Sequence, residues 1–425
     1  MIPSLMSRSV KKVVVVGGGV IGLCTAYYAS LRGHEVAVLD RNPEQTPGCS
    51  FGNAGMIVPS HFIPLAAPGM VALGLKWMWN SESPFYIKPR LNWELLDWGW
   101  KFWKAANPSH VARCAPVLRD LHLASRTAFE ELAAVPGLDF GLLQRGLVML
   151  CKTAHTLEEE ARTAEQARAL GIPAEVLDPA AAARLDPNVR MDIAGAVYFP
   201  RDCSITPHLL MQGLRHEAQR LGARFHDNAE VLRWRHNQGR IDAVETTRGD
   251  FTADEFVIAG GSWSPVVASQ LQLRLPMQAG KGYSVTVPNP RQLPAICSIF
   301  TEARVAVTPM GKSLRFGGTM EISGLSEVVN PARVRGILRA VPHYYPEFQP
   351  EDFDGLEPWR GLRPCAPDGM PYVGRFDSFR NLSAATGHAM MGLSLGPVTG
   401  KLMASILSGE KPAISLELLN PNRYA

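Results

Sequence analysis

The chain has 425 residues, of which 46% are hydrophobic and 19% are charged. These proportions are typical of a folded protein with more than one domain and exclude a mainly disordered chain. The net charge of +4 comes from interspersed lysines and arginines without a long basic run, which argues against nucleic acid as a partner.

The first predicted elements form a strand–helix–strand unit around a glycine-rich loop. Residues 13–16 are four valines, which is typical of a strand buried in a parallel sheet, and residues 17–22 read GGGVIG. A helix is expected from Leu23 to about Leu31, and a second strand over 35–39 ends at Asp40. Two lysines before the apolar run resemble the start of a signal peptide, but the glycines and the βαβ pattern argue against one.

Each part of this loop suits the binding of a dinucleotide. Gly17 permits a tight turn, Gly19 lets the backbone approach a pyrophosphate, and Gly22 allows the helix to pack closely on the strand. The helix N-terminus offers free N–H groups to the phosphates, and a carboxylate about 20 residues later accepts hydrogen bonds from ribose hydroxyls. The motif does not distinguish FAD from NAD. The predicted contacts are Gly17, Gly19, Val20, Ile21, Gly22, Asp40 and Arg41.

Tryptophan is concentrated in the next segment. Six of the nine tryptophans lie between residues 76 and 104, at positions 77, 79, 93, 98, 100 and 103, interleaved with lysine and arginine. Such a mixture suits contact with a membrane surface, but the same rings could instead pack the outer wall of a substrate domain. No later segment reaches the roughly 20 apolar residues of a membrane-spanning helix. We therefore expect a cytoplasmic protein that is either soluble or peripheral to the inner face of the cell membrane.

The middle of the chain predicts alternate visits to two domains. A charged helix over 157–170 is expected at the surface. Two strands, over 229–234 and 241–246, flank a turn at 237–239, and a buried strand over 256–259 runs into two glycines. This strand indicates a return to the dinucleotide domain. Strands and a helix of a second layer, the substrate domain, are predicted over 276–288, 300–320 and 333–342.

Four further strings make the pattern specific. They are FGNAG at 51–55, WRGLRP at 359–364, PDGMPYVG at 367–374 and ATGHAMMGL at 385–393. Together with the glycine loop, and in this order, they closely resemble the glycine and D-amino-acid oxidase superfamily, and within it the bacterial D-amino-acid dehydrogenases. The likeness covers residues from about 10 to about 410.

The resemblance implies an α/β fold in which a Rossmann-like FAD-binding domain, a parallel sheet with helices, is interleaved with an α+β substrate domain that has a mixed or antiparallel sheet. We assign residues 1–60, 201–265 and 356–425 to the first domain, and 61–200 and 266–355 to the second. The FAD is expected to be non-covalent, because the cysteine of covalent relatives lies in the C-terminal region and Cys365 is out of register for it. The further implied FAD contacts are Asn53, Ala54, Gly55, Val231, Gly260, Gly361, Gly387, His388, Gly392 and Leu393.

The resemblance also implies a substrate site. Arg363 is assigned to the substrate carboxylate, because a guanidinium makes two parallel hydrogen bonds to that group; the alternative is an internal salt bridge. The string KGYS resembles the family's strand over the flavin, so Tyr283 and Lys281 are candidates for a second carboxylate contact or a cover of the pocket. His61 is a candidate for the pocket. No residue is assigned as an acid or base, and His388 is not taken as one.

The implied reaction is the FAD-dependent oxidative deamination of a D-amino acid. A hydride would pass from the α-carbon to flavin N5, and the imine would hydrolyse to a 2-oxo acid and ammonia. The alternatives are a D-hydroxyproline or other imino-acid dehydrogenase, a sarcosine or glycine oxidase, and a flavoprotein subunit that needs a partner for turnover. The electron acceptor stays open between oxygen and a quinone or electron-transfer partner. Seven scattered cysteines without a Cys-x-x-Cys pair predict no metal or iron–sulfur site and favour a reducing compartment.

Overall fold

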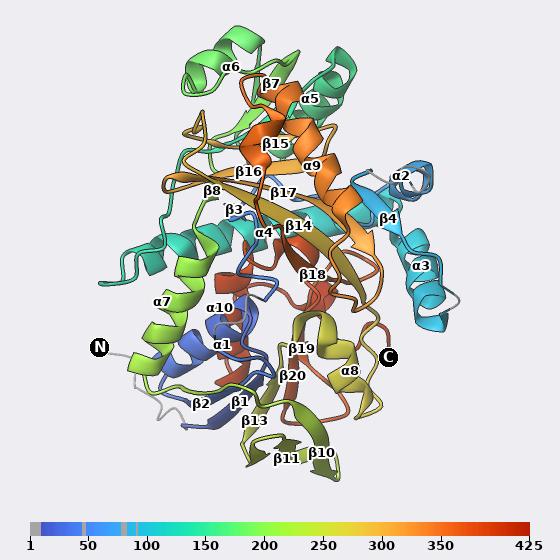
Figure 1. Ribbon diagram of the computed structural model, residues 1–425. Coiled ribbons are helices and arrows are strands. Elements are labelled where there is room, and N and C mark those ends of the chain that lie inside the picture. Colours follow the sequence, from blue (N-terminus) through green and yellow to red (C-terminus); the bar gives the residue numbers. More distant parts are fainter. Residues whose placement is uncertain (1–9, 45–47, 78–82, 91) are drawn as a thin grey trace, which may run out of the picture.

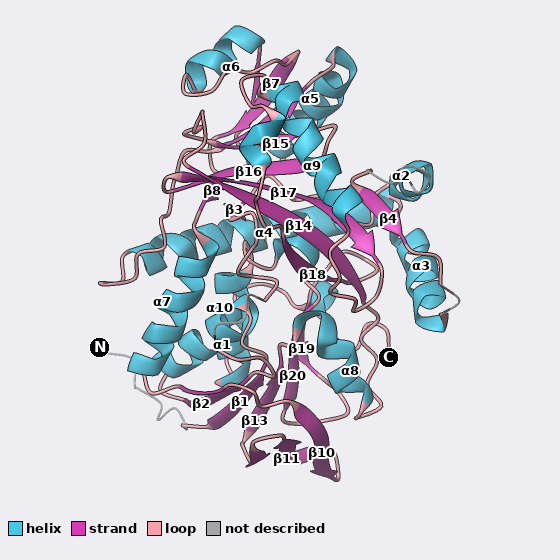
Figure 2. Ribbon diagram, viewed as in Figure 1, coloured by secondary structure: helices cyan, strands magenta, loops and turns pink. Residues whose placement is uncertain are grey.

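The computed structural model describes residues 10–44, 48–77, 83–90 and 92–425. Two large sheets organise the chain, a six-stranded sheet and a nine-stranded sheet, with helices between them and on their outer sides (Figure 1, Figure 2). The expected α/β class, with a parallel sheet and a second, mixed sheet, is confirmed.

The six-stranded sheet has the order β19-β20-β13-β1-β2-β9, and only β19 runs antiparallel to its neighbour. The valines at 13–16 are buried in the middle of this sheet, because a central parallel strand is covered on both faces. The strands are β1 (Lys12–Val16), β2 (Glu35–Leu39), β9 (Arg224–His226), β13 (Glu255–Ile258), β19 (Tyr372–Arg375) and β20 (Leu382–Thr386).

Four helices share one apolar core over this sheet: α1 (Val20–Leu31), α4 (Pro108–Ala133), α7 (Pro207–Arg220) and α10 (Gly396–Leu407). Helix α1 begins at Val20, three residues before the predicted start. Glycines let α10 lie directly on α1, since a Cβ on Gly400 would stand 2.6 Å from the carbonyl oxygen of Cys24. Helix α4 lies between the two sheets in Figure 1 and packs against α10, although its residues were expected in the substrate domain.

The nine-stranded sheet has the order β18-β14-β17-β16-β15-β5-β7-β6, with β4 beside β17, and most of its pairs are antiparallel. Its outer helices are α5 (Ala154–Ala169), α6 (Pro179–Leu185) and α9 (Pro331–Tyr344). Helix α5 is the surface helix that the sequence predicts. The strands are β4 (Phe85–Ile87), β5 (Leu147–Cys151), β6 (Glu175–Leu177), β7 (Gly195–Phe199), β14 (Gln278–Pro288), β15 (Cys297–Phe300), β16 (Val305–Met310), β17 (Ser313–Ile322) and β18 (Trp359–Cys365).

The division of the chain between the sheets differs from the predicted boundaries at one strand. All strands of the six-stranded sheet come from the three segments assigned to the FAD-binding domain. Strand β18 was placed in the same domain but pairs with β14 in the nine-stranded sheet. The correction has a plain cause, because backbone pairing between β18 and β14 joins segments about 80 residues apart and leaves no local signal in the sequence.

The smaller elements include the predicted hairpin. It is formed by β10 (Val231–Asn237) and β11 (Arg240–Thr246), which β12 (Gly249–Phe251) extends to three strands, and β3 (Met56–Ile57) pairs with β8 (Cys203–Ser204). The remaining helices are α2 (Met70–Trp77), α3 (Trp93–Ala105) and α8 (Ser264–Ser269), with 3-10 turns η1 (Gly261–Trp263), η2 (Pro350–Phe353), η3 (Ala389–Met391) and η4 (Glu417–Leu419).

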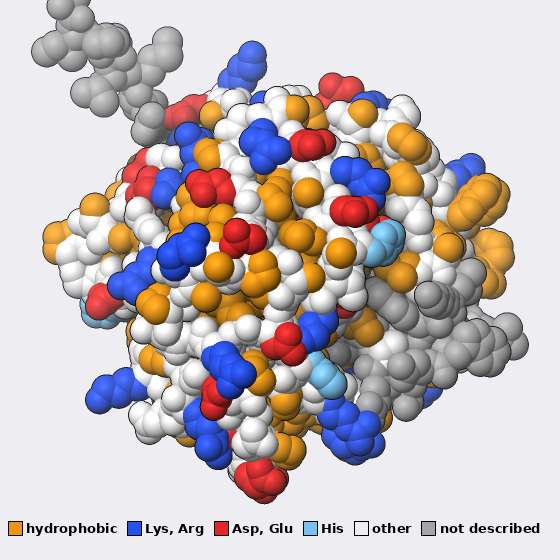
Figure 3. Space-filling view, turned by 90° about the horizontal axis from the view of Figure 1, so that it is seen from above, with side chains coloured by type: hydrophobic (Ala, Val, Ile, Leu, Met, Phe, Trp, Pro, Cys, Tyr) orange, Lys and Arg blue, Asp and Glu red, His pale blue; other side chains and the backbone are white. Residues whose placement is uncertain are grey.

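The surface has mixed charge. Figure 3 shows basic and acidic side chains interspersed over the face above the nine-stranded sheet, in agreement with the small net charge. Among the residues that the structure describes, no helix combines the length and the apolarity needed to cross a bilayer. All seven cysteines are free thiols.

Candidate active site

Two cavities meet at one place in the protein. The first, here the loop cavity, has a volume of about 220 Å³ and is lined by the glycine loop, the end of β2 and residues after β13. The second, here the sheet cavity, has a volume of about 450 Å³ and lies against the nine-stranded sheet. Cys49, Asn53 and Arg363 line both cavities, so a ligand in one would reach a ligand in the other.

The glycine loop has the geometry that the motif predicts. Gly17 has a φ of 117°, and a Cβ there would stand 2.5 Å from the carbonyl oxygen of Ala259. The N-cap residue of α1 is Gly19, which has no side chain to cap the helix. Within the described residues, the one side chain that accepts from this first turn is Ser50, whose Oγ accepts from the Val20 N–H at 3.1 Å. The beginning of α1 therefore presents backbone N–H groups and a partial positive charge to the loop cavity.

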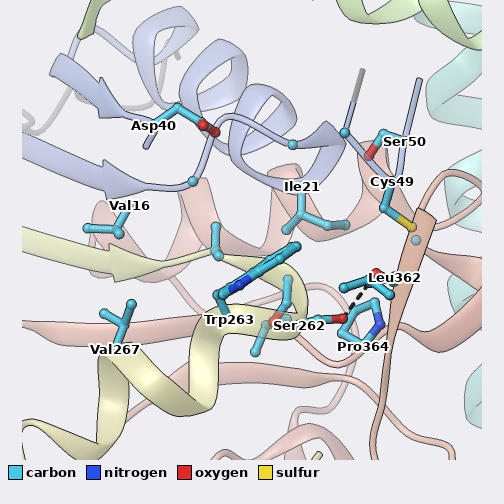
Figure 4. A pocket seen from close by; sticks show the side chains of 18 of the residues that line it. Val16, Ile21, Asp40, Cys49, Ser50, Ser262, Trp263, Val267, Leu362 and Pro364 are labelled. Atoms are coloured by element: carbon cyan, nitrogen blue, oxygen red, sulfur yellow. Dashed lines mark hydrogen bonds between the residues drawn. The ribbon is translucent and has the colours of Figure 1, made fainter. Parts of the chain in front are cut away.

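The carboxylate at the end of β2 is held in place by backbone donors. Asp40 accepts hydrogen bonds from the N–H of Gly18 at 2.6 Å and of Asn42 at 2.8 Å. Figure 4 shows Asp40 on the wall of the cavity, with the Trp263 ring bordering the same space. The Arg41 guanidinium lies 3.9 Å from the centre of the Trp263 ring, which is a cation–π contact. One rim of the cavity is thus both aromatic and cationic.

Most predicted FAD contacts line the loop cavity, and five do not. Gly22, Gly55 and Gly387 serve packing instead: added Cβ atoms would meet Gly17 O at 1.8 Å, Ile205 O at 2.3 Å and Tyr372 Cδ2 at 2.7 Å. Ala54 and Gly361 line the sheet cavity. The predicted residues that do line the loop cavity are Gly17, Gly19, Val20, Ile21, Asp40, Arg41, Asn53, Val231, Gly260, His388, Gly392 and Leu393.

Sequence reasoning missed several residues of this cavity. Ser50 contacts the start of α1, and Ser262 donates to the carbonyl oxygen of Leu362 at 3.0 Å, the dashed line in Figure 4. Trp263 also lines this cavity and was not among the predicted contacts. A signal was present, because Ser262 and Trp263 directly follow the glycine pair after the buried strand, the position in which a βαβ-type turn presents side chains to a ligand.

His388 is buried beside the loop cavity and is held by one hydrogen bond. Its Nε2 lies 3.0 Å from Thr399 Oγ1 in the first turn of α10, and its Nδ1 has no hydrogen-bond partner within the described chain. Burial lowers the pKa of His388 to about 3, so the ring is neutral near pH 7. A neutral ring with an unused nitrogen suits hydrogen bonding to a bound group and does not suit proton storage.

These features fit an adenine dinucleotide that carries a flavin. The loop cavity offers uncapped backbone N–H groups for phosphates, a fixed carboxylate for a ribose, glycines whose Cβ atoms would occupy the space of neighbouring backbone, and the unused nitrogen of His388. Since the cavity ends where the sheet cavity begins, the far end of such a ligand would face the second cavity.

Arg363 stands at the junction of the two cavities as a half-buried cation. Its side chain donates to the carbonyl oxygen of Thr319 at 2.5 Å, and no carboxylate in the described part of the chain lies within ion-pair distance of it. Burial lowers the pKa of its guanidinium. Room for the group comes from Gly282, where a Cβ would stand 2.2 Å from the guanidinium. The alternative of an internal salt bridge therefore finds no partner, and donors remain for an anion.

Lys281 and Tyr283 are engaged elsewhere. The Tyr283 hydroxyl donates to Glu321 at 2.9 Å, and the Lys281 ammonium lies 3.3 Å from the same carboxylate and donates to the carbonyl oxygen of Val328 at 2.8 Å. Lys281 lines neither cavity, and Tyr283 reaches the sheet cavity while its hydroxyl is already committed. Their contact with the substrate therefore stays a prediction, and Glu321 on β17 neutralises the lysine inside the sheet.

The sheet cavity is mainly apolar and extends to the helices at the side of the molecule. Its outer wall includes Met70 from α2, Phe85 from β4, and Trp98 and Phe102 from α3. The Trp359 ring lies over the inner end, in space left by two glycines, since a Cβ on Gly52 would be 2.0 Å from the ring and one on Gly361 2.2 Å. His61 also lines this cavity, as predicted for the pocket.

Comparisons with known proteins agree with this geometry. The family model described as FAD dependent oxidoreductase (DAO) matches residues 12–406. The D-amino acid dehydrogenase of Cereibacter sphaeroides (strain ATCC 17029 / ATH 2.4.9) is 34% identical over 97% of this chain and 95% of the relative. The D-amino acid dehydrogenase of Methylobacterium nodulans is 35% identical over 97% and 99%. Among solved structures, glycine oxidase from Geobacillus kaustophilus has a TM-score of 0.78 and 26% identity over 98% of this chain and 99% of that chain. L-proline dehydrogenase from P. horikoshii, with a TM-score of 0.74 and 17% identity over 98% of both chains, shares the fold.

Proposed function

Since this chain belongs to the DAO family of FAD-dependent oxidoreductases, we propose that it is an amino-acid dehydrogenase or oxidase that takes its substrate in the sheet cavity. The family and the cofactor predicted from the sequence are thereby confirmed. The observation that carries the proposal is Arg363, a half-buried cation with unused donors at the end of the loop cavity. A mainly apolar cavity with such a group at its junction with the loop cavity is suited to a small molecule that bears a carboxylate.

Arg363 would hold the substrate carboxylate by two parallel hydrogen bonds and so fix the α-carbon beside the end of the loop cavity. When bound, FAD supplies the hydride acceptor for the C–H bond next to the amine. The apolar walls exclude water from the reacting carbon until the imine leaves for solution, where it hydrolyses to a 2-oxo acid and ammonia.

Within this class we propose a D-amino acid as the substrate. The support comes from relatives at 34% and 35% identity that carry the name D-amino acid dehydrogenase. The sheet cavity, at about 450 Å³, offers more room than glycine or sarcosine requires, which favours a substrate with a side chain. A D-hydroxyproline or other imino acid fits the same anchor and the same cavity, and is the second candidate.

The test is anaerobic mixing of the FAD-loaded protein with a panel of D- and L-amino acids, imino acids, sarcosine and glycine, while the blue absorption band of the flavin is followed. Bleaching by D-amino acids and not by their L-enantiomers supports the proposal. Bleaching by glycine or sarcosine alone would select the runner-up. An absence of bleaching with every amine would favour a flavoprotein subunit that needs a partner for turnover.

We further propose that α3 contacts a membrane surface, which would place the protein near a quinone-type electron acceptor. Trp93, Trp100 and Trp103 are 79%, 55% and 57% exposed, and Leu96 lies between them on the same face of the helix. The Lys104 ammonium lies 4.9 Å from the centre of the Trp100 ring. Exposed indoles beside lysine are typical of helices that lie in the headgroup region of an anionic bilayer. In Figure 1, α3 projects at one side of the molecule together with α2 and β4.

FAD is proposed to bind without a covalent bond. Cys365 is fully buried, lines neither cavity and lies 3.9 Å from Met320 Sδ. Cys49 lines both cavities, but burial raises the pKa of its thiol to about 11, so it is protonated near pH 7 and a poor nucleophile. Neither thiol is therefore arranged for attachment to the flavin.

A further inference from the structure

His61 belongs to a hydrogen-bonded chain that ends at a fully buried carboxyl group. Ser60 Oγ lies 3.0 Å from His61 Nδ1 and donates to Asp202 Oδ2 at 2.5 Å. The Ser60 N–H also donates to Asp202 Oδ1 at 3.1 Å. Asp202 has no exposed surface, and no lysine or arginine in the described ranges lies within ion-pair distance of it. Burying a carboxyl group without an ion-pair partner costs free energy of folding, so its presence at this depth points to a functional role.

When Asp202 is ionised, the hydrogen count sets the tautomer of the histidine. The Ser60 hydroxyl has one hydrogen, and an ionised Asp202 can only accept, so the hydroxyl donates to Asp202. The Ser60 oxygen must then accept from His61 Nδ1–H. This arrangement leaves Nε2 of neutral His61 with a free lone pair, since the ring's contact to Ser60 is made through Nδ1. His61 therefore presents a proton acceptor to the sheet cavity.

The turn that carries His61 is fastened to the wall between the two cavities. The His61 N–H donates to the carbonyl oxygen of Val58 at 3.0 Å, and the Val58 N–H donates to Ser394 Oγ at 3.1 Å. Ser394 lines the sheet cavity, while Gly392 and Leu393 directly before it line the loop cavity. The imidazole is thus positioned from the same segment that separates the substrate from the cofactor.

We propose that His61 accepts the proton that the substrate ammonium must lose before the α-hydride can leave, and that Ser60 and Asp202 position the ring for this step. This inference rests on the proposed amino-acid oxidation. An ammonium nitrogen has no lone pair and cannot form the C=N bond. The proton passes to His61 Nε2, the N–H electron pair stays on nitrogen, and it becomes the new π bond as the hydride departs with the C–H pair. Asp202 stabilises the resulting imidazolium through Ser60.

The charges around this chain set its pH range. Burial, and next the positive charge of Arg304, lower the pKa of His61 to about 4, so the ring is neutral and able to accept near pH 7. Burial raises the pKa of Asp202 to about 7, against the opposing hydrogen bonds from Ser60 and the positive charge of Arg126. His122 on α4 is a further titratable group near His61, and burial keeps it neutral by lowering its pKa to about 3. Proton acceptance should improve as Asp202 ionises through about pH 7.

The test compares the wild type with His61→Gln, using the best D-amino acid from the panel and the anaerobic rate of flavin bleaching between pH 6 and about 10. At pH 7 we expect bleaching by His61→Gln to be about 100-fold slower. The deficit should shrink by up to about tenfold per pH unit as free amine becomes available from solution. Asp202→Asn should lose the rise in rate near pH 7. His155→Gln, at an exposed histidine on α5, is the matched control and should equal the wild type.

Separate outcomes distinguish this inference from the proposed function. If the wild type is bleached by no amino acid, the proposed function fails. If the wild type is bleached but His61→Gln has the same rate, or is slower by the same factor at every pH, proton acceptance by His61 is overturned. The affinity for propionate, a carboxylate without an amine, should be unchanged in His61→Gln, since it depends on Arg363. Where His61→Gln does not retain FAD, Ser60→Ala provides the same pH test, because it removes the link that orients the ring.

Discussion

At the scale of single residues, the sequence was most informative where a string has a chemical reason. The WRGLRP string points to Arg363, and the structure places this arginine where two cavities meet. The KGYS string predicts substrate contacts for Lys281 and Tyr283, but both side chains contact Glu321. Glu321 is about 40 residues away in the chain and is adjacent only through the pairing of β14 with β17. A partner of this kind has no local signal, so the sequence could not show that both side chains contact Glu321.

Arg363→Ala should raise KM for the substrate far more than it changes the rate at saturation. Removal of one partner of a desolvated charge pair costs about 2 to 5 kcal/mol, so the change in kcat/KM should lie between about 30-fold and several thousand-fold. Arg363→Lys should recover little, because an ammonium cannot make two parallel hydrogen bonds. Steady-state kinetics with an artificial electron acceptor measures this effect. Unchanged kinetics would remove Arg363 from the substrate site.

Gly282 leaves the space that the Arg363 guanidinium occupies, so we expect substrate binding to depend on this glycine as well as on the arginine. A Cβ at Gly282 would stand 2.2 Å from the Arg363 guanidinium, so Gly282→Ala must displace this group. We expect KM to rise by at least tenfold while the protein still binds FAD, whose cavity does not include Gly282. The control is the same Gly282→Ala change in the Arg363→Ala background, where it should add little because the guanidinium that it would displace is absent. An equal rise in KM in both backgrounds would contradict this account.

At the scale of elements, the positions of strands and helices with a regular hydrophobic pattern were predicted well. Which side of an element is buried and which is exposed was predicted less well. The valine strand and its partner at 35–39 lie where the sequence places them, and the charged helix predicted over 157–170 corresponds to α5. The tryptophan cluster had two readings, and α3 divides it: Trp98 is buried and donates to the carbonyl oxygen of Cys365 at 2.8 Å, while other tryptophans of the helix are exposed. Trp79 lies outside the described residues. A count of tryptophans could not separate these two environments.

The exposed face of α3 predicts binding to anionic vesicles. The triple variant Trp93→Ser, Trp100→Ser and Trp103→Ser should abolish sedimentation with vesicles that contain phosphatidylglycerol, because burial of the indoles is lost. Its rate of flavin bleaching by the amino acid should stay that of the wild type, since none of the three lines a cavity. Leu232→Ser, an equally exposed apolar residue on β10, is the control and should sediment normally. A wild type that stays in the supernatant would end the membrane hypothesis.

At the scale of the whole molecule, the sequence predicts that the chain alternates between two domains, but it does not predict which elements join the two layers. The return of the chain to the first sheet is marked by a second buried strand with glycines, a local pattern. The transfer of β18 to the nine-stranded sheet and the packing of α4 against α10 depend on contacts between distant segments. Such contacts form only when both layers are assembled, and this limits what any local reading of the sequence can find.

The loop cavity is lined by residues from all three segments assigned to the FAD-binding domain. Bound FAD should therefore raise the free energy of unfolding of the whole fold. A ligand that binds only the native state adds about 2.7 kcal/mol at 100 times its Kd, so the Tm should rise as FAD is added to the cofactor-free protein. Asp40→Ala should weaken this rise, since it removes the carboxylate proposed to hold the ribose.

Acid precipitation should leave the yellow colour in the supernatant. A yellow pellet would mean a covalent bond, and Cys49→Ser, at the thiol that borders both cavities, would then identify its site.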